Sequence, residues 1–83
     1  MSEQENTILT LGEKRVRTTF NPDNDSIVQH VKERAAEFIN YVNDNIKLED
    51  PTNSKGAEFA RLKALSLTAI EEAAMWAVKA ATI

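Results

Sequence analysis

Hydrophobic side chains recur every three or four residues through the middle of the chain. Between residues 22 and 47 these apolar positions are Ile27, Val28, Val31, Ala35, Phe38, Ile39, Val42 and Ile46. This spacing places them along one side of an α-helix, and such a side is normally buried. The pattern therefore predicts a helix over residues 22–47 with a single apolar face.

The C-terminal segment, residues 55–81, is also helical in pattern, but its apolar residues are spread more widely. It contains nine alanines, and alanine has the highest helix propensity. Its larger apolar residues are Phe59, Leu62, Leu65, Leu67, Ile70, Met75, Trp76 and Val78. A helix that is apolar around much of its circumference needs more than one packing partner.

The residues before the first predicted helix, 1–20, form an N-terminal arm. Its later part mixes β-branched and basic residues with neither helical nor strand periodicity, so we expect an ordered arm with a short strand or a turn at Gly12. Asn21 is a good N-cap residue, and Pro22 suits the first position of a helix. The first helix is therefore expected to begin at Pro22.

Residues 48–54 contain Asp-Pro and Asn-Ser pairs, which are typical of turns. Two helices joined by this loop make an antiparallel hairpin about 38 Å long. The fold class is therefore all-α, in one domain that spans residues 1–83. A two-helix hairpin encloses no core, and the chain has no cysteine to staple it. We therefore expect a homo-oligomer of hairpins packed side by side.

Charge and composition exclude several classes of function. The net charge of −3 argues against general DNA binding, and no apolar run is long enough to span a membrane. The acidic, polar N-terminus does not resemble a signal peptide, so an intracellular protein is expected. His30 has no neighbouring ligand set, and the adjacent Glu71 and Glu72 point in different directions on a helix. We expect no enzyme activity, no metal site and no cofactor.

Basic residues provide a candidate anion site. Lys14, Arg15 and Arg17 approach the expected N-terminus of the first helix, where free amides and the helix dipole attract anions. Lys32 lies ten residues beyond Pro22, or about 15 Å along the helix axis. It would reach a second phosphate of a compact ligand, or serve a pocket shared by two subunits. The alternative is that these side chains are solubilising surface charges.

Two aromatic residues and a second helical face complete the candidates. Phe20 and Trp76 are each able to stack on a base, but Trp76 lies in an apolar helix where core packing is the simpler role. Arg61, Ala64 and Thr68 share one helical face. Around a three-fold axis, three copies of Arg61 would converge on one anion. The alternative for Arg61 is an exposed surface charge.

These residues resemble a small phage-encoded family. The resemblance rests on the run from Arg15 to Pro22, on Val31-Lys32, on Arg61 and on the run from Leu65 to Ala80. The last run carries a T-x-x-E-x-A-x-x-W-x-x-K-A pattern, and the resemblance spans residues 14–81. The similar proteins are the helical-hairpin sponges that counter CBASS immunity, and the phage anti-Thoeris sponge has a related domain.

The resemblance implies a function and an assembly. CBASS cyclases make cyclic di- and trinucleotides that activate lethal effectors, and the sponges bind these messengers without degrading them. By this resemblance the protein would form hexamers in the cytoplasm of the infected host. Cyclic dinucleotides such as cyclic GMP-AMP would lie between pairs of protomers, and cyclic trinucleotides would lie in separate pockets at three-fold junctions.

The resemblance also implies site residues. In the dinucleotide pocket, the family's arm aromatic aligns with Arg17, and its helix lysine aligns with Lys32. An arginine also stacks on purines through its guanidinium plane. Phe20, Asn21 and Pro22 match the segment that enters the first helix.

The trinucleotide pocket of the family aligns with residues of the second helix. Its arginine matches Arg61, and the turns that follow offer Ala64, Leu65 and Thr68. Leu65 supplies no hydroxyl where the family has a small or hydroxyl residue. The leading hypothesis is thus a cyclic-oligonucleotide sponge. A phage structural or interaction protein, an α-hairpin oligomer without a nucleotide ligand, is the alternative, and an enzyme comes third.

Overall fold

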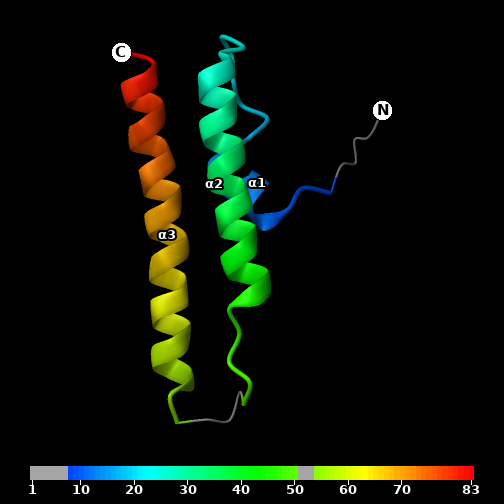
Figure 1. Ribbon diagram of the computed structural model, residues 1–83, viewed down its shortest axis with the longest axis vertical. Coiled ribbons are helices and arrows are strands. Elements are labelled where there is room, and N and C mark those ends of the chain that lie inside the picture. The colour runs from blue at the N-terminus through cyan, green and yellow to red at the C-terminus, as the bar shows by residue number, and fades with distance from the viewer. Residues whose placement is uncertain (1–7, 51–53) are drawn as a thin grey trace.

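The structure, a computed structural model, describes residues 8–50 and 54–83. Within these ranges it contains three helices and no strand: α1 (Leu11–Val16), α2 (Ser26–Asn45) and α3 (Gly56–Ala81). α2 and α3 lie side by side and run in opposite directions, and α1 packs beside the middle of α2 (Figure 1). The prediction of an all-α helical hairpin is confirmed. Residues 1–7 of the predicted arm and 51–53 of the predicted loop lie outside the described residues.

The arm contains a short helix where we expected a strand or a turn at Gly12. Thr10 and Glu13 form a capping box at its start: the Glu13 amide donates to Thr10 Oγ1 at 3.2 Å, and the Thr10 amide donates to Glu13 Oε1 at 2.9 Å. The Thr-x-x-Glu spacing of such a box is visible in the sequence. These reciprocal bonds stabilise a helix too short to show its own periodicity.

Gly12 brings α1 into direct contact with α2. A Cβ atom on Gly12 would lie 2.2 Å from the backbone oxygen of Ala36, so only glycine allows this approach. The Gly12 amide donates to Asn40 Oδ1 at 2.8 Å, and Asn40 Nδ2 donates to Thr10 Oγ1 at 3.0 Å. One side chain of α2 therefore holds the first turn of α1 in a fixed register.

The start of α2 differs from the prediction. The N-cap is Asp25, whose carboxylate accepts from the amides of Ile27 at 2.8 Å and Val28 at 3.1 Å. Asn21 does not cap the helix at residue 22; its side chain instead accepts from the Asp25 amide at 3.1 Å and donates to the Asp25 carbonyl at 2.8 Å. Asn21 therefore closes a turn that precedes the cap, and α2 begins four residues later than expected.

The other helix ends lie close to the expected positions. α2 ends at Asn45, two residues before the predicted end, and α3 extends from Gly56 to Ala81. The core is a narrow strip between α1, α2 and α3, with Ile39 fully buried at its centre. Its buried apolar members are Val16, Ala36, Ile39, Val42, Leu67 and Ala74.

Many large apolar side chains remain outside this core. α3 contributes only Leu67 and Ala74 to the buried residues, although its composition is strongly apolar. About half or more of each of these side chains is exposed: Phe20, Ile27, Phe38, Tyr41, Ile46, Leu62, Leu65, Met75 and Trp76. In the described ranges, no helix is both long and apolar enough to cross a membrane.

Candidate functional site

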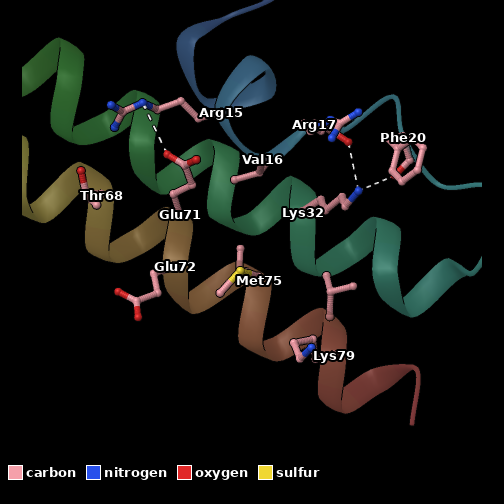
Figure 2. Close-up of a pocket in the computed structure, with 12 residues that line it drawn as sticks. Arg15, Val16, Arg17, Phe20, Lys32, Thr68, Glu71, Glu72, Met75 and Lys79 are labelled. Atoms are coloured by element: carbon pink, nitrogen blue, oxygen red, sulfur yellow. Dashed lines mark hydrogen bonds and ion pairs between the residues drawn. The ribbon is translucent and has the colours of Figure 1, made fainter.

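An open cavity of about 660 Å³ lies where the end of the arm meets α2 and α3. It contains four basic side chains and two carboxylates in a chain whose net charge is −3, so positive charge is locally in excess. Figure 2 shows its lining: Arg15, Val16, Arg17, Phe20, Lys32, Thr68, Glu71, Glu72, Ala74, Met75, Val78 and Lys79.

Lys32 ties the arm to α2. Only 8% of this residue is exposed, and its Nζ atom donates to the Arg17 carbonyl at 3.1 Å and to the Phe20 carbonyl. Burial, followed by repulsion from the Arg17 guanidinium, lowers the pKa of Lys32 from its ordinary value. The buried ammonium therefore fixes the position of the backbone at Arg17 and Phe20, whose side chains also line the cavity.

The prediction that Lys32 lies about 15 Å along the helix axis from an N-terminus at Pro22 is wrong. That estimate placed the first turn of α2 at Pro22, whereas α2 begins at Ser26 and the arm lies alongside it. Arg17, Phe20 and Lys32 consequently meet within a single chain, and Figure 2 shows the two hydrogen bonds that join them.

Arg17 and Phe20 form a stacked pair at the cavity. Arg17 ends α1 in the left-handed conformation, with φ of 59°, which is uncommon for a residue other than glycine. Its Cζ atom lies 4.7 Å from the centre of the Phe20 ring, and Lys32 Nζ lies 5.3 Å from the same centre. An aromatic ring with two cations beside it presents both a stacking surface and positive charge.

The N-terminus of α2 is not the anion site that we predicted. The Asp25 carboxylate already accepts from the amides of Ile27 and Val28. This negatively charged cap occupies the amide donors that an anion would need. The basic residues of the arm therefore do not form an anion site with the N-terminus of α2. Arg15 and Arg17 line the cavity between the helices, whereas Lys14 is exposed outside it.

α3 supplies the other wall of the cavity. Thr68, Glu71, Glu72, Met75 and Lys79 follow one another at helical offsets of three, four, seven and eleven residues. From the sequence, Glu71 and Glu72 were considered only as a catalytic pair, which their different directions on the helix exclude, and Met75 and Lys79 were not selected as site residues. Continuing the Arg61–Ala64–Thr68 face by further turns of the helix would have found them.

Asn21 and Pro22 lie beside this cavity rather than in it. They line a smaller cavity of about 250 Å³ that shares Phe20, Lys32 and Val78 with the larger one. The structure thus brings the five residues of the expected dinucleotide pocket into one neighbourhood, and their contact with a nucleotide stays a prediction.

The residues of the expected trinucleotide pocket are divided. Thr68 lines the large cavity, whereas Arg61, Ala64 and Leu65 are exposed on the preceding turns of α3. Arg61 Nη2 lies 2.7 Å from Glu58 Oε2. This hydrogen bond raises the pKa of Arg61 and lowers the pKa of Glu58. Contact of these residues with a ligand stays a prediction.

Trp76 and His30, two further residues considered as candidates, are both exposed. Trp76 is 55% exposed and its Nε1 donates to Glu72 Oε2 at 3.2 Å, so the expectation that it packs in the core of the chain is wrong. Over residues 8–50 and 54–83, no group of three or more histidine, aspartate or glutamate side chains is placed to hold a metal ion.

The fold and the cavity together define a helical-hairpin protein whose docked arm builds a basic, aromatic-lined pocket against both helices. The family model of the Acb2/Tad1 hairpin domain matches residues 12–82, and the chain therefore belongs to that family. This confirms the resemblance to the anti-CBASS and anti-Thoeris sponges. Among curated proteins and solved structures, none matches the chain significantly. The family is one of sequestering sponges, which implies a role in holding cyclic nucleotides.

Proposed function

We propose that this protein sequesters cyclic di- and trinucleotide immune messengers without degrading them. In this proposal it is encoded by a phage, acts in the cytoplasm of the infected host and prevents the messengers of CBASS from activating their effectors. The observation that carries the proposal is the basic cavity at Arg17, Phe20 and Lys32, found in a hairpin of the Acb2/Tad1 family.

The chemistry of the cavity suits a cyclic dinucleotide. Such a ligand has flat bases and two phosphodiester charges. The exposed Phe20 ring and the guanidinium of Arg17 offer surfaces for base stacking. Lys32 uses two of its three N–H donors on backbone carbonyls, which leaves one for a phosphate oxygen. The charge-assisted bonds formed in this way are the strong ones in proteins.

Self-association would complete the site. The cavity is open to solvent in one chain, and many large side chains of α2 and α3 are exposed around it. A second copy placed over these side chains would bury apolar surface and close the cavity over its ligand. We propose a homohexamer, in which cyclic dinucleotides lie between paired protomers and cyclic trinucleotides bind near Arg61, Ala64, Leu65 and Thr68.

The local distribution of charge supports selection for small ligands. The chain carries a net charge of −3, while the cavity gathers Arg15, Arg17, Lys32 and Lys79. Long nucleic acids would meet the repulsive overall field, whereas a compact dianion would enter the basic cavity. Strong, salt-sensitive binding to duplex DNA would contradict this part of the proposal.

Titration calorimetry with cyclic GMP-AMP and with cyclic tri-adenylate tests the proposal. We expect saturable binding, followed by recovery of the intact nucleotide when the complex is denatured and chromatographed. Flat traces with both ligands would favour a structural α-hairpin oligomer without a nucleotide ligand. A linear product in the chromatogram would instead indicate catalysis.

Arg61→Ala separates the two proposed pockets. This variant should retain its affinity for cyclic GMP-AMP and lose affinity for cyclic tri-adenylate, because Arg61 lies outside the cavity that contains Lys32. Equal losses with both ligands would mean that the assignment of two separate pockets is wrong.

A further inference from the structure

Arg15 forms an unusual contact across the cavity. Its Nε atom lies 3.7 Å from Glu71 Oε1, so the pair links the end of α1 to the middle of α3 (Figure 2). Two other ion pairs, Arg34–Glu37 at 3.0 Å and Arg61–Glu58 at 2.7 Å, lie within single helices and are shorter. The Arg15–Glu71 pair, by contrast, joins two helices and is loosely formed.

The guanidinium of Arg15 also has an unused donor. Its Nη1 atom is buried and has no hydrogen-bond partner in the described part of the chain. Buried polar atoms almost always find a partner, and one without a partner requires an explanation. At 3.7 Å, Glu71 Oε1 lies beyond hydrogen-bond distance of Arg15 Nε, so Glu71 compensates the charge of the guanidinium without satisfying its donors. A planar fork of this kind is suited to bidentate recognition of an oxyanion.

Arg15 and Arg17 mark different ends of the cavity. In Figure 2, the Arg15 and Glu71 pair lies toward Thr68, whereas Arg17, Phe20 and Lys32 lie together on the other side of Met75. The cavity thus has two separate groups of positive charge. The group at Arg15 has a carboxylate of the same chain, Glu71, beside it.

We infer that Arg15 is a second phosphate-binding residue and that Glu71 occupies its guanidinium until a ligand arrives. This inference rests on the proposed function. On binding, one phosphodiester group meets Arg17 and Lys32, and the other replaces the Glu71 carboxylate at Arg15. Glu71 therefore lowers the affinity for the ligand, and its effect depends on Arg15.

Two isosteric variants isolate this exchange. Glu71→Gln and Glu72→Gln remove the same charge from adjacent positions that both line the cavity, but only Glu71 contacts Arg15. Titration with cyclic GMP-AMP should show about fivefold tighter binding for Glu71→Gln than for Glu72→Gln, since a unit charge at contact distance in water has about this effect. Equal affinities, or weaker binding by Glu71→Gln, would overturn the inference.

The double variant Arg15→Gln/Glu71→Gln shows whether the gain depends on Arg15. It should lose the tighter binding and bind several-fold more weakly than the wild type; retention of the gain would contradict a role for Arg15. Arg15→Gln alone should also bind several-fold more weakly, and unchanged affinity would overturn the inference.

The wild-type titration distinguishes failure of this inference from failure of the proposed function. If the wild-type protein binds no cyclic nucleotide, the proposed function fails and the inference fails with it. If the wild-type protein binds but the variants do not differ as expected, only the inference fails. Circular dichroism melts establish that each variant is folded.

Discussion

α1 and α3 both pack against α2, but by different means. α1 has six residues and is held by directional contacts with α2. Gly12 lies against a backbone oxygen of α2, Asn40 of α2 accepts from the first turn of α1, and the buried Lys32 of α2 donates to the carbonyl of Arg17, just after the end of α1. α3 has 26 residues, yet only Leu67 and Ala74 are buried. Its larger apolar residues are half-exposed along much of its length.

This difference indicates that a single chain determines the position of α1, whereas the exposed apolar surface of α3 is available to a partner. Close approach and hydrogen bonds require particular residues, so the position of α1, and with it Arg15 and Arg17, is determined within one protomer. Apolar area is nondirectional and is stabilised by any well-packed cover. The outer surface of α3 therefore suits contacts between copies, while the arm builds the cavity.

Gly12→Ala should disrupt the packing of α1 against α2, and it should have the largest effect of the variants considered. The new methyl group would lie 2.2 Å from the backbone oxygen of Ala36, and backbone gives way poorly, so α1 should move off α2. We expect a loss of about 3 kcal/mol in the free energy of unfolding and severe loss of cyclic GMP-AMP binding. Urea titration and calorimetry, at one protein concentration, measure both.

Gly56→Ala provides the matched control for that variant. It makes the same change at the first residue of α3, away from the contact between α1 and α2. Its free energy of unfolding should stay within about 0.5 kcal/mol of the wild type. A Gly12→Ala protein that is as stable as this control would contradict the close approach of α1 to α2.

Lys32→Met should have the next largest effect. The methionine keeps the apolar stem but leaves the carbonyls of Arg17 and Phe20 without their donor, which costs about 2 kcal/mol. Binding of cyclic GMP-AMP should fall at least tenfold in calorimetry, since the cavity loses a positive charge and the arm is released.

Lys63→Met controls for loss of a lysine that joins two elements. Lys63 on α3 donates to the Asn43 carbonyl on α2 at 3.1 Å, and it does not line the cavity. This variant should lose some stability but retain its affinity for cyclic GMP-AMP. Equal loss of affinity in the two lysine variants would mean that Lys32 acts only through stability.

Asp25→Ala should have a smaller effect, and it tests whether Asp25 caps the start of α2. Loss of the side chain that caps Ile27 and Val28 costs about 1 kcal/mol in the free energy of unfolding. Asp25→Ser, which retains a capping oxygen, should recover most of the loss in thermal melts. If the serine variant is no more stable than the alanine variant, then capping is not the role of Asp25.

Leu62→Ser should have the smallest effect on the single chain. Leu62 is 53% exposed, so the change should alter the folding of a protomer by about 0.5 kcal/mol or less. If other copies of the chain pack against α3, Leu62→Ser should weaken their association, which analytical ultracentrifugation measures as a larger monomer fraction.

Leu67→Ala, by contrast, removes a side chain that is only 8% exposed and should destabilise the protomer itself by about 3 kcal/mol.

The fold was largely predictable because long helices reveal themselves by periodicity. The Ile27–Val42 spacing and the alanines of α3 sufficed for the hairpin. The start of α2 was misplaced because Asn21 and Asp25 are both good caps, and only the turn between them decides which is used. The Thr10–Glu13 capping box was a readable signal for α1 that was missed.

The site was less predictable because it depends on how the arm folds back. Lys32 and Arg17 are chosen readily as cations, but their meeting is produced by hydrogen bonds to carbonyl groups, which no residue type reveals. The wall formed by Glu71, Met75 and Lys79 follows from helical offsets once one member is known. Trp76 was expected in the core because its helix is apolar, yet α2 covers only one side of that helix.

The proposed assembly and its ligand are tested together by native mass spectrometry of the purified protein with cyclic GMP-AMP. The proposed hexameric sponge should give a complex whose mass is six times 9.3 kDa, the mass of one chain, plus that of intact nucleotide, with little free monomer at micromolar concentration. A folded monomer of 9.3 kDa that carries no nucleotide would contradict it.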